Sequence, residues 1–173
     1  MRSLVLNLAV SLDGFIEGPN GEFDWCFADQ DYGMKAFLER IDGIVFGRKS
    51  YTVLKSMGAD PYPDKQKYVV SRTLTETPTE VEILRGDFAS EIRAIKNRPG
   101  RDLWLFGGAQ LTTALLDARL VDELQLAVHP ILLGAGRALF HGASERIMLT
   151  LIDTRAYSSG LVQLIYQLKS RQR

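Results

Sequence analysis

The 173-residue chain predicts a three-layer α/β domain with a central mixed sheet of about eight strands, helices on both faces and a C-terminal antiparallel hairpin. In the first two thirds, short apolar runs alternate with segments whose apolar residues recur at helical spacing, which is typical of crossovers in a parallel sheet. The last third contains only strand-like segments, which predict antiparallel strands added at one side. We expect a single domain over residues 1–173, because no linker, repeat or low-complexity tract divides the chain.

The N-terminal elements follow from local patterns. The apolar run Leu4–Val10 predicts a strand that ends at the turn residues Asp13 and Gly14. Residues 14–24 are rich in glycine and turn formers, so we expect a mobile loop that closes over a ligand. Residues 32–40 have apolar side chains at helical spacing and predict the first helix.

The remaining elements are predicted by the same two periodicities. We expect strands at 44–46, 67–70, 81–84 (at an edge of the sheet), 103–106, 121–133, 147–154 and 161–168, and helices at 48–57, 87–96 and 109–116.

Composition excludes several classes of protein. Lys and Arg together number 21, as do Asp and Glu, so no basic field favours nucleic acid or an anionic membrane. The single cysteine, Cys26, excludes an internal disulfide, and the two histidines lie without a zinc motif, so we expect no metal. No signal peptide precedes the first strand and no apolar run approaches the roughly 18 residues of a membrane span, so we expect a cytoplasmic protein.

Three predicted strand ends carry residues that suit phosphate. Gly47-Arg48-Lys49-Ser50 follows one strand, Ser71-Arg72 follows a second, and Gly107-Gly108 joins a third to its helix. Glycines let backbone approach a ligand closely, and the free N–H groups of a helix start favour an anion. The carboxyl ends of parallel strands lie at one edge of a sheet, so these turns together match a ligand with several separated phosphates, such as NADPH.

Other motifs are weaker. Arg48 stands where a nucleotide P-loop requires glycine, and the glycines at 134 and 136 lack the third glycine of a dinucleotide fingerprint. Acids near the first loop are candidates for proton transfer, although exposed acids and helix caps are commoner. The catalytic candidates are Asp13, Asp29 and Asp31.

Five short fragments occur along the chain in the same order as in one known family. They are Ser11–Ile16, Phe46–Tyr51, Val70–Arg72, Leu105–Ala109 and Pro130–Gly136. With them the chain resembles the dihydrofolate reductase superfamily, most closely the reductase domain of riboflavin-biosynthesis deaminase/reductases and their stand-alone relatives. The resemblance implies NADPH as hydride donor, held through its 2′-phosphate side and its pyrophosphate. It implies cofactor contacts by Ala9, Ile16, Gly47, Arg48, Lys49, Ser50, Ser71, Arg72, Gly107, Gly108, Ala109, Gln110 and Leu111, and substrate contacts by Val10, Asp13, Trp25 and Phe106.

Two departures from the pattern of dihydrofolate reductases weaken the prediction that this protein reduces folate. Gln30 stands where dihydrofolate reductases usually have an acid, and the helix after the diglycine has no aromatic residue. We therefore expect an NADPH-dependent reductase of a pyrimidine- or pterin-like heterocycle, of the 5-amino-6-(5-phosphoribosylamino)uracil reductase type. Dihydrofolate reductase and a non-catalytic nucleotide-binding protein are the alternatives. The chain has no room for a fused deaminase, and its apolar last strands predict a homodimer.

Overall fold

A computed structural model describes residues 1–75 and 78–168 of the chain. The strands are β1 (Leu4–Ser11), β2 (Phe15–Glu17), β3 (Ile41–Gly47), β4 (Gln66–Val70), β5 (Val81–Leu84), β6 (Asp102–Gly107), β7 (Glu123–His129), β8 (Arg137–Ala138), β9 (Leu149–Ala156) and β10 (Val162–Leu168). The helices are α1 (Met34–Arg40), α2 (Arg48–Ser56), α3 (Phe88–Asn97) and α4 (Ala109–Asp117). None of the helices in the described part is long and apolar enough to cross a membrane.

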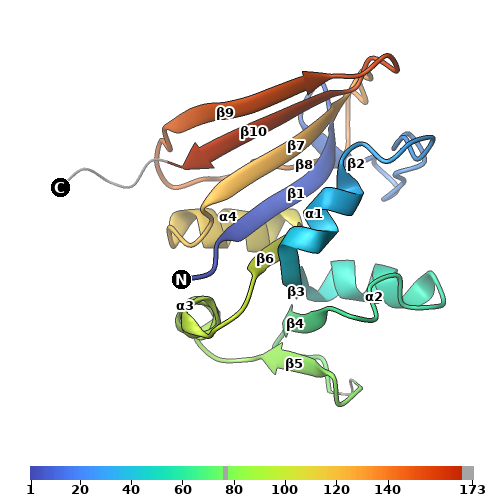
Figure 1. Cartoon of the computed structure of the whole chain (residues 1–173). Helices are drawn as coiled ribbons and strands as arrows, with labels where there is room; N and C mark the ends of the chain where they lie inside the picture. Colours follow the sequence, from blue (N-terminus) through green and yellow to red (C-terminus); the bar gives the residue numbers. More distant parts are fainter. Residues whose placement is uncertain (76–77, 169–173) are drawn as a thin grey trace.

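An eight-stranded mixed sheet runs in the order β5-β4-β3-β6-β1-β7-β10-β9 (Figure 1). The six strands from β5 to β7 are parallel to their neighbours, whereas β10 is antiparallel to both β7 and β9. The predicted sheet, its C-terminal hairpin and the edge position of β5 are therefore confirmed. The parallel strands all end at one edge of the sheet, where ligands gather in open α/β folds.

The sheet separates two hydrophobic cores because successive side chains of a strand point to opposite faces. In β1, Leu4 and Leu6 pack into the core that α3 and α4 cover, whereas Val5 packs into the core under α1 and α2. All three side chains are fully buried. The apolar strands that the sequence predicted as buried are therefore covered by helices on both faces.

Arg40, the last residue of α1, fixes that helix against the sheet. Its guanidinium forms two hydrogen bonds of 2.7 and 2.9 Å to the Glu123 carboxylate and one of 2.8 Å to Asp102. The Glu123 contact, followed by that of Asp102, raises the pKa of Arg40 despite partial burial. The bidentate contact positions α1 beside the amino ends of β6 and β7.

Two sequence expectations were wrong in detail. Residues 14–24 are not wholly a loop, because Phe15–Glu17 forms β2 and pairs with β8. The predicted strand 121–133 is shorter, since β7 ends at His129 before Pro130, which has no N–H to donate to a ladder. Gly136 allows β2 to pair with β8, because a β-carbon at this position would lie 2.1 Å from the Glu17 carbonyl oxygen.

Candidate active site

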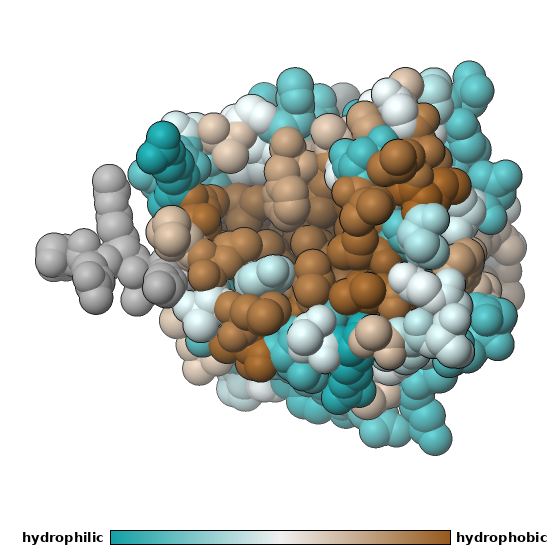
Figure 2. Space-filling model, turned by 90° about the horizontal axis from the view of Figure 1, so that it is seen from above, coloured by the Kyte–Doolittle hydropathy of each residue, from teal (hydrophilic) through white to brown (hydrophobic). Residues whose placement is uncertain are grey.

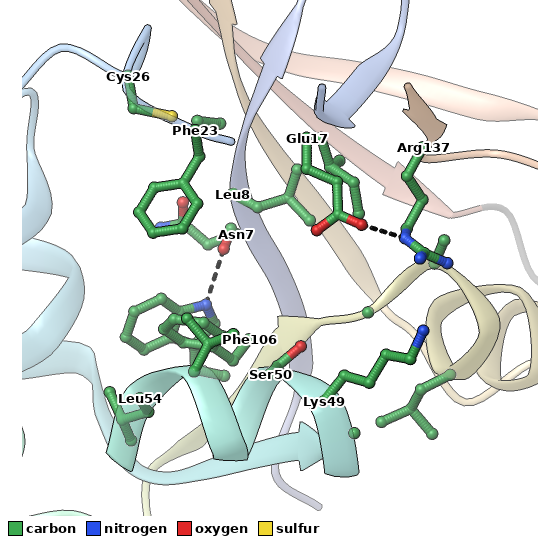
Figure 3. Close-up of a pocket in the computed structure, with 18 of the residues that line it drawn as sticks. Asn7, Leu8, Glu17, Phe23, Cys26, Lys49, Ser50, Leu54, Phe106 and Arg137 are labelled. Carbon is green, nitrogen blue, oxygen red and sulfur yellow. Dashed lines mark hydrogen bonds and ion pairs between the residues drawn. The ribbon is translucent and has the colours of Figure 1, made fainter. Parts of the chain in front are cut away.

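A cavity of about 1100 Å³ opens at the carboxyl ends of the parallel strands. Its wall comes from the ends of β1, β3, β4, β5 and β6, the first turns of α2 and α4, and residues 21–34 (Figure 3). Most of these segments are strand ends that lie far apart in the sequence, and the pairing of the strands in the sheet brings them together. The cavity lies where the parallel topology predicts a ligand site.

One part of the wall, here named the cationic side, carries every Lys and Arg that lines the cavity in the described part of the chain. Arg48 and Lys49 form the first turn of α2, Arg72 follows β4, and Arg85 follows β5. Arg137 of β8 completes the set and forms an ion pair with Glu17 (Figure 3). Helix N-termini add unpaired N–H groups to this positive charge, so this side suits an anion.

The diglycine joint has the backbone that a close ligand approach needs. Gly107 has φ 116° and Gly108 has φ 101°, both in the region that favours glycine, and α4 begins at the next residue. A β-carbon on Gly108 would lie 3.3 Å from the hydroxyl oxygen of Ser50 in α2. Ser50 also donates a hydrogen bond of 3.3 Å to the Gly107 carbonyl. The starts of α2 and α4 therefore lie against each other and leave a narrow cradle for phosphate.

The opposite part of the wall, here named the aromatic side, is formed by rings from three segments of the chain. Trp104 and Phe106 point to one face of β6, with centroids 4.8 Å apart, and Tyr62 lies 5.2 Å from Trp104. The Trp104 indole donates a 2.8 Å hydrogen bond to the Asn7 carbonyl of β1 (Figure 3). The aromatic side comprises Phe23, Phe27, Tyr32, Tyr62, Trp104 and Phe106.

His129, at the end of β7, docks the loop that carries Phe23, Phe27 and Tyr32. Its Nε2 accepts a 3.0 Å hydrogen bond from the Phe27 backbone N–H, and its Nδ1 lies 2.9 Å from the Ala127 carbonyl. The first bond requires a lone pair on Nε2, so the proton belongs on Nδ1. The rings of Trp25 and Phe27 pack edge-on against the imidazole at 5.3 and 5.0 Å. The neutral imidazole thus fixes the loop to the sheet.

Most of the expected cofactor residues line this one cavity. They are Ala9, Ile16, Gly47, Arg48, Lys49, Ser50, Ser71, Arg72, Gly108, Ala109, Gln110 and Leu111, whereas Gly107 lies just behind the wall. Among the expected substrate residues, Phe106 lines the cavity. Val10 is buried in a core, and Trp25 packs against His129 outside the lining.

The three candidate acids are not brought together. The Asp13 carboxylate lies outside the cavity lining and accepts hydrogen bonds from the Ser11 hydroxyl and the backbone N–H groups of Leu133 and Gly134. The Ser11 bond, followed by the backbone bonds from Gly134 and Leu133, lowers the pKa of Asp13, although desolvation acts in the opposite direction. Through the bonds from Leu133 and Gly134, the Asp13 carboxylate holds the loop after β7 against the end of β1.

The other two acids are also engaged. Asp29 accepts a 2.7 Å hydrogen bond from the Tyr32 hydroxyl and lies outside the lining. Asp31 does line the cavity, but its oxygens accept backbone hydrogen bonds from Gly33 and Lys35 at the start of α1. All three carboxylates therefore accept local hydrogen bonds, and Asp31 is the one of the three that lines the cavity.

Sequence reasoning missed the residues that come from distant parts of the chain. Glu17 and Arg137 meet in the cavity wall only because β2 pairs with β8. Tyr62 and Gln163 reach the wall from a loop and from β10. No local motif marks these residues. The one signal for the ion pair was the opposite charge of two residues flanking turn-rich segments.

The strand order and the cavity above its parallel strands define a dihydrofolate-reductase-like protein. Residues 2–163 match the RibD C-terminal domain, and the chain belongs to this family of reductases. It is 42% identical over 177 residues to the uncharacterized protein YyaP of Bacillus subtilis (strain 168), covering 95% of this chain and 94% of that protein.

Solved structures agree with this membership. A putative riboflavin biosynthesis protein from Shewanella sp. PV-4 superposes with a TM-score of 0.86 and 30% identity, covering 98% of this chain and all of that chain. Dihydrofolate reductase from Enterococcus faecalis, solved with NADP(H), superposes with a TM-score of 0.70 and 19% identity over 97% of each chain. The second likeness concerns the fold alone.

Proposed function

We propose that this protein is an NADPH-dependent reductase of a pyrimidine- or pterin-like heterocycle, of the type found in riboflavin biosynthesis. The observation that carries the proposal is the joining of two helix starts, four strand-end cations and a diglycine cradle in one cavity with an aromatic wall. Membership of a reductase family and the NADP(H) bound to the Enterococcus faecalis enzyme support it.

The cationic side would hold the cofactor. Arg48 and Arg72, at two neighbouring strand ends, carry the charge that the 2′-phosphate requires, and the N–H groups at the start of α4 suit the pyrophosphate. When bound, NADPH supplies a hydride from its nicotinamide C4. Ala9 and Ile16, from β1 and β2, line the same cavity and would border the nicotinamide.

Positioning would supply most of the catalysis. The aromatic side holds the acceptor flat, and the loop docked on His129 excludes bulk water from that side. No carboxyl group in the described lining is free of a local hydrogen bond, so we propose that the acceptor takes its proton from water. This replaces the proton relay through Asp13, Asp29 or Asp31 that the sequence suggested.

The cofactor proposal is tested by calorimetric titration with NADPH, NADP⁺ and NADH. We expect NADPH to bind more tightly than NADH, and we expect Arg48→Ala and Arg72→Ala each to weaken NADPH about tenfold while leaving NADH nearly unchanged, because a charge-assisted bond to phosphate contributes about 1.5 kcal/mol or more. Arg155→Ala, on exposed β9, is the control. Equal binding of NADPH and NADH would contradict the proposal.

Turnover separates an enzyme from a binding protein. NADPH oxidation is followed at 340 nm with 5-amino-6-(5-phosphoribosylamino)uracil, with its form lacking phosphate, and with dihydropterins including dihydrofolate. Oxidation with one of these acceptors supports a reductase. Tight NADPH binding without oxidation or hydride exchange with any acceptor would instead favour the non-catalytic alternative.

We also propose that two copies associate through β9 and β10. Met148, Leu151 and Ile152 are 66%, 50% and 57% exposed, and Figure 2 shows apolar side chains across the middle of the upper face. Exposed apolar patches of this kind are typical of protein contacts. Sedimentation at increasing concentration should give the dimer mass, and a constant monomer mass would contradict the proposal.

The single cysteine and the use of NADPH support a cytoplasmic setting.

A further inference from the structure

The charge of the cavity is divided sharply between its two sides. Every Lys and Arg of the described lining belongs to the cationic side, and the aromatic side carries one carboxylate, Asp31. Helix α2 spans both regions, with Arg48 at its start and Met57 just past its end. At about 1.5 Å of rise per residue the two lie about 13 Å apart along the axis. In Figure 3, Glu17 and Arg137 accordingly lie on the other side of β1 from Phe23 and Cys26.

The nearest cations beyond the aromatic side are accompanied by acids. A shallow hollow of about 470 Å³ adjoins Tyr62 and contains Lys35, Lys65 and Arg101, together with Asp31, Glu39 and Asp64. The Lys65 ammonium lies 2.7 Å from the Asp64 carboxylate, and Arg101 donates a 2.8 Å hydrogen bond to the Glu39 carbonyl. Three cations and three carboxylates leave this hollow without the net positive charge that a phosphate dianion requires.

Apart from the Asp31 carboxylate, the polar side chains described below for the aromatic side are neutral. Gln30 and Gln163 present amides to the cavity, and the Tyr32 hydroxyl lies 2.7 Å from Asp29 and 2.9 Å from the Ser159 hydroxyl. Amides can donate to and accept from the edge of a heterocycle. Phe23 of the loop lies above Asn7 and Phe106 of β6 lies below it in Figure 3, and both rings line the cavity and offer surfaces for stacking of a flat ring.

We propose that the acceptor of this reductase is an uncharged, flat aromatic heterocycle that carries neither a phosphate nor a carboxylate tail. The inference rests on the proposed function, since it assigns the cationic side to the cofactor. A phosphorylated pyrimidine would have to bury its dianion among aromatic rings and one carboxylate, because every cation in the lining lies on the cofactor's side. A ring without a tail brings no charge near the Asp31 carboxylate and can contact the stacking surfaces and the neutral amides.

The test compares matched probes on the NADP⁺-loaded protein. The first pair is 5-amino-6-ribosylaminouracil and its 5′-phosphate, and the second is 6-methyl-7,8-dihydropterin and dihydrofolate. Binding is measured by calorimetry and by quenching of Trp104 in the Trp25→Phe variant, which leaves one of the two tryptophans. We expect the member without a tail to bind at least tenfold more tightly in the pair that fits. Tighter binding of the tailed member of either pair, or no binding of either tail-free probe, would overturn the inference.

Failure of the proposed function gives a different result. If NADP⁺ and NADPH do not bind, the assignment of the cationic side is wrong, whatever the probes do. If NADP⁺ binds and the phosphorylated probe is preferred, only the inference on the acceptor is wrong. The two measurements are made on the same preparation, so misfolding would be seen in both.

A positive charge added near the aromatic side tests directly whether the lack of a cation there is what excludes phosphate. Met57 is 65% exposed, so Met57→Arg should fold and should strengthen binding of the phosphorylated probe about tenfold. Thr52→Arg places the same charge on α2 outside the lining and should have no such effect. Equal effects of the two variants would show that the missing cation is not what excludes phosphate.

Removal of a ring tests the stacking surface. Phe23→Ala should weaken the tail-free probe about tenfold, as stacking of a base on an aromatic ring commonly contributes. Phe140 is similarly exposed, at 50% against 48%, and lies outside the lining, so Phe140→Ala is the matched control. Unchanged binding in Phe23→Ala would remove the loop from the proposed site.

Discussion

The two sides of the cavity are built in different ways. Apart from Arg137 of β8, the cationic side consists of turns that directly follow β3, β4, β5 and β6, so its residues are neighbours in the sheet and its motifs are two to four residues long. The aromatic side and the lining around it join residues 23–34, the end of α2, Tyr62, β6 and β10, which lie up to 140 positions apart, as Phe23 and Gln163 do. The first surface is a property of strand ends and the second is a property of the whole fold.

This difference suggests how the two surfaces can vary. The positions of the strand ends are fixed by the hydrogen bonds between neighbouring strands, so a phosphate site there depends on glycines and cations at particular positions. The aromatic side depends on a loop docked by His129 and on a helix end, both of which tolerate substitution more readily. We therefore expect relatives on this fold to share the cationic side and to differ on the aromatic side.

The largest effect that we predict concerns Cys26 on the aromatic side. Burial, followed by the nearby Asp24 carboxylate, raises the pKa of its thiol to about 11 from an ordinary value of 9.0. At pH 8 the reactive thiolate should be about 100-fold scarcer than in a small thiol of ordinary pKa, and modification should be more than about tenfold slower, because the greater nucleophilicity of a high-pKa thiolate offsets part of the loss and burial slows access. Reaction with dithionitrobenzoate measures this rate, with the protein unfolded in urea as the reference.

Modification of folded Cys26 at the rate of the unfolded chain would mean that this side is wetter or more positive than described. The contrast between the two sides would then lose its electrostatic basis, and the inference of an uncharged acceptor would lose support.

A tenfold effect is predicted at the diglycine. Gly108→Ala places a β-carbon at φ 101° and 3.3 Å from the Ser50 hydroxyl, so it strains the backbone and narrows the phosphate cradle. We expect NADPH binding about tenfold weaker and unfolding easier by about 1 to 3 kcal/mol. Calorimetry and urea denaturation measure the two quantities.

The control for this variant is Gly58→Ala. Gly58 has a similar φ of 95°, has open space where its β-carbon would lie, and is outside the cavity lining. It should lose stability in the same range but bind NADPH normally. If both variants bind normally, the cradle does not hold the cofactor, and the cationic side must be reassigned.

The same contrast explains what could be predicted from the sequence. Periodicity and turn residues predicted the parallel sheet and a helix at 87–96, where the Asp87 carboxylate caps α3 by accepting from the N–H groups of Ala89 and Ser90. The cationic turns were found because charge and glycine are local signals. Tyr62, Gln163 and the pair of Glu17 with Arg137 could not be found, because only tertiary packing brings them to the cavity. The roles given to the acids depended on their place beside the first loop in the sequence, which does not show where their side chains point or what they contact.

The smallest effect concerns Asp13, which lies outside both sides and accepts hydrogen bonds from Ser11, Leu133 and Gly134. These bonds lower its pKa below the ordinary value of 3.8, so its charged form stabilises the fold above that pH. The stabilisation is lost as the pH falls through the lower, folded-state pKa. Asp13→Asn should therefore melt at a lower temperature than the parent protein at pH 7, and the gap should narrow as the pH drops below 3.8.

The function of this variant decides between a structural and a catalytic Asp13. Because the carboxylate does not line the cavity, Asp13→Asn should bind NADPH normally and should oxidise it at nearly the parent rate with any acceptor that the parent uses. A loss of turnover with unchanged binding and melting would return Asp13 to the reaction, through water or through movement of the loop after β7. An unchanged rate with a melting gap that shrinks in acid would show that Asp13 is structural, and would support the proposal that the acceptor takes its proton from water.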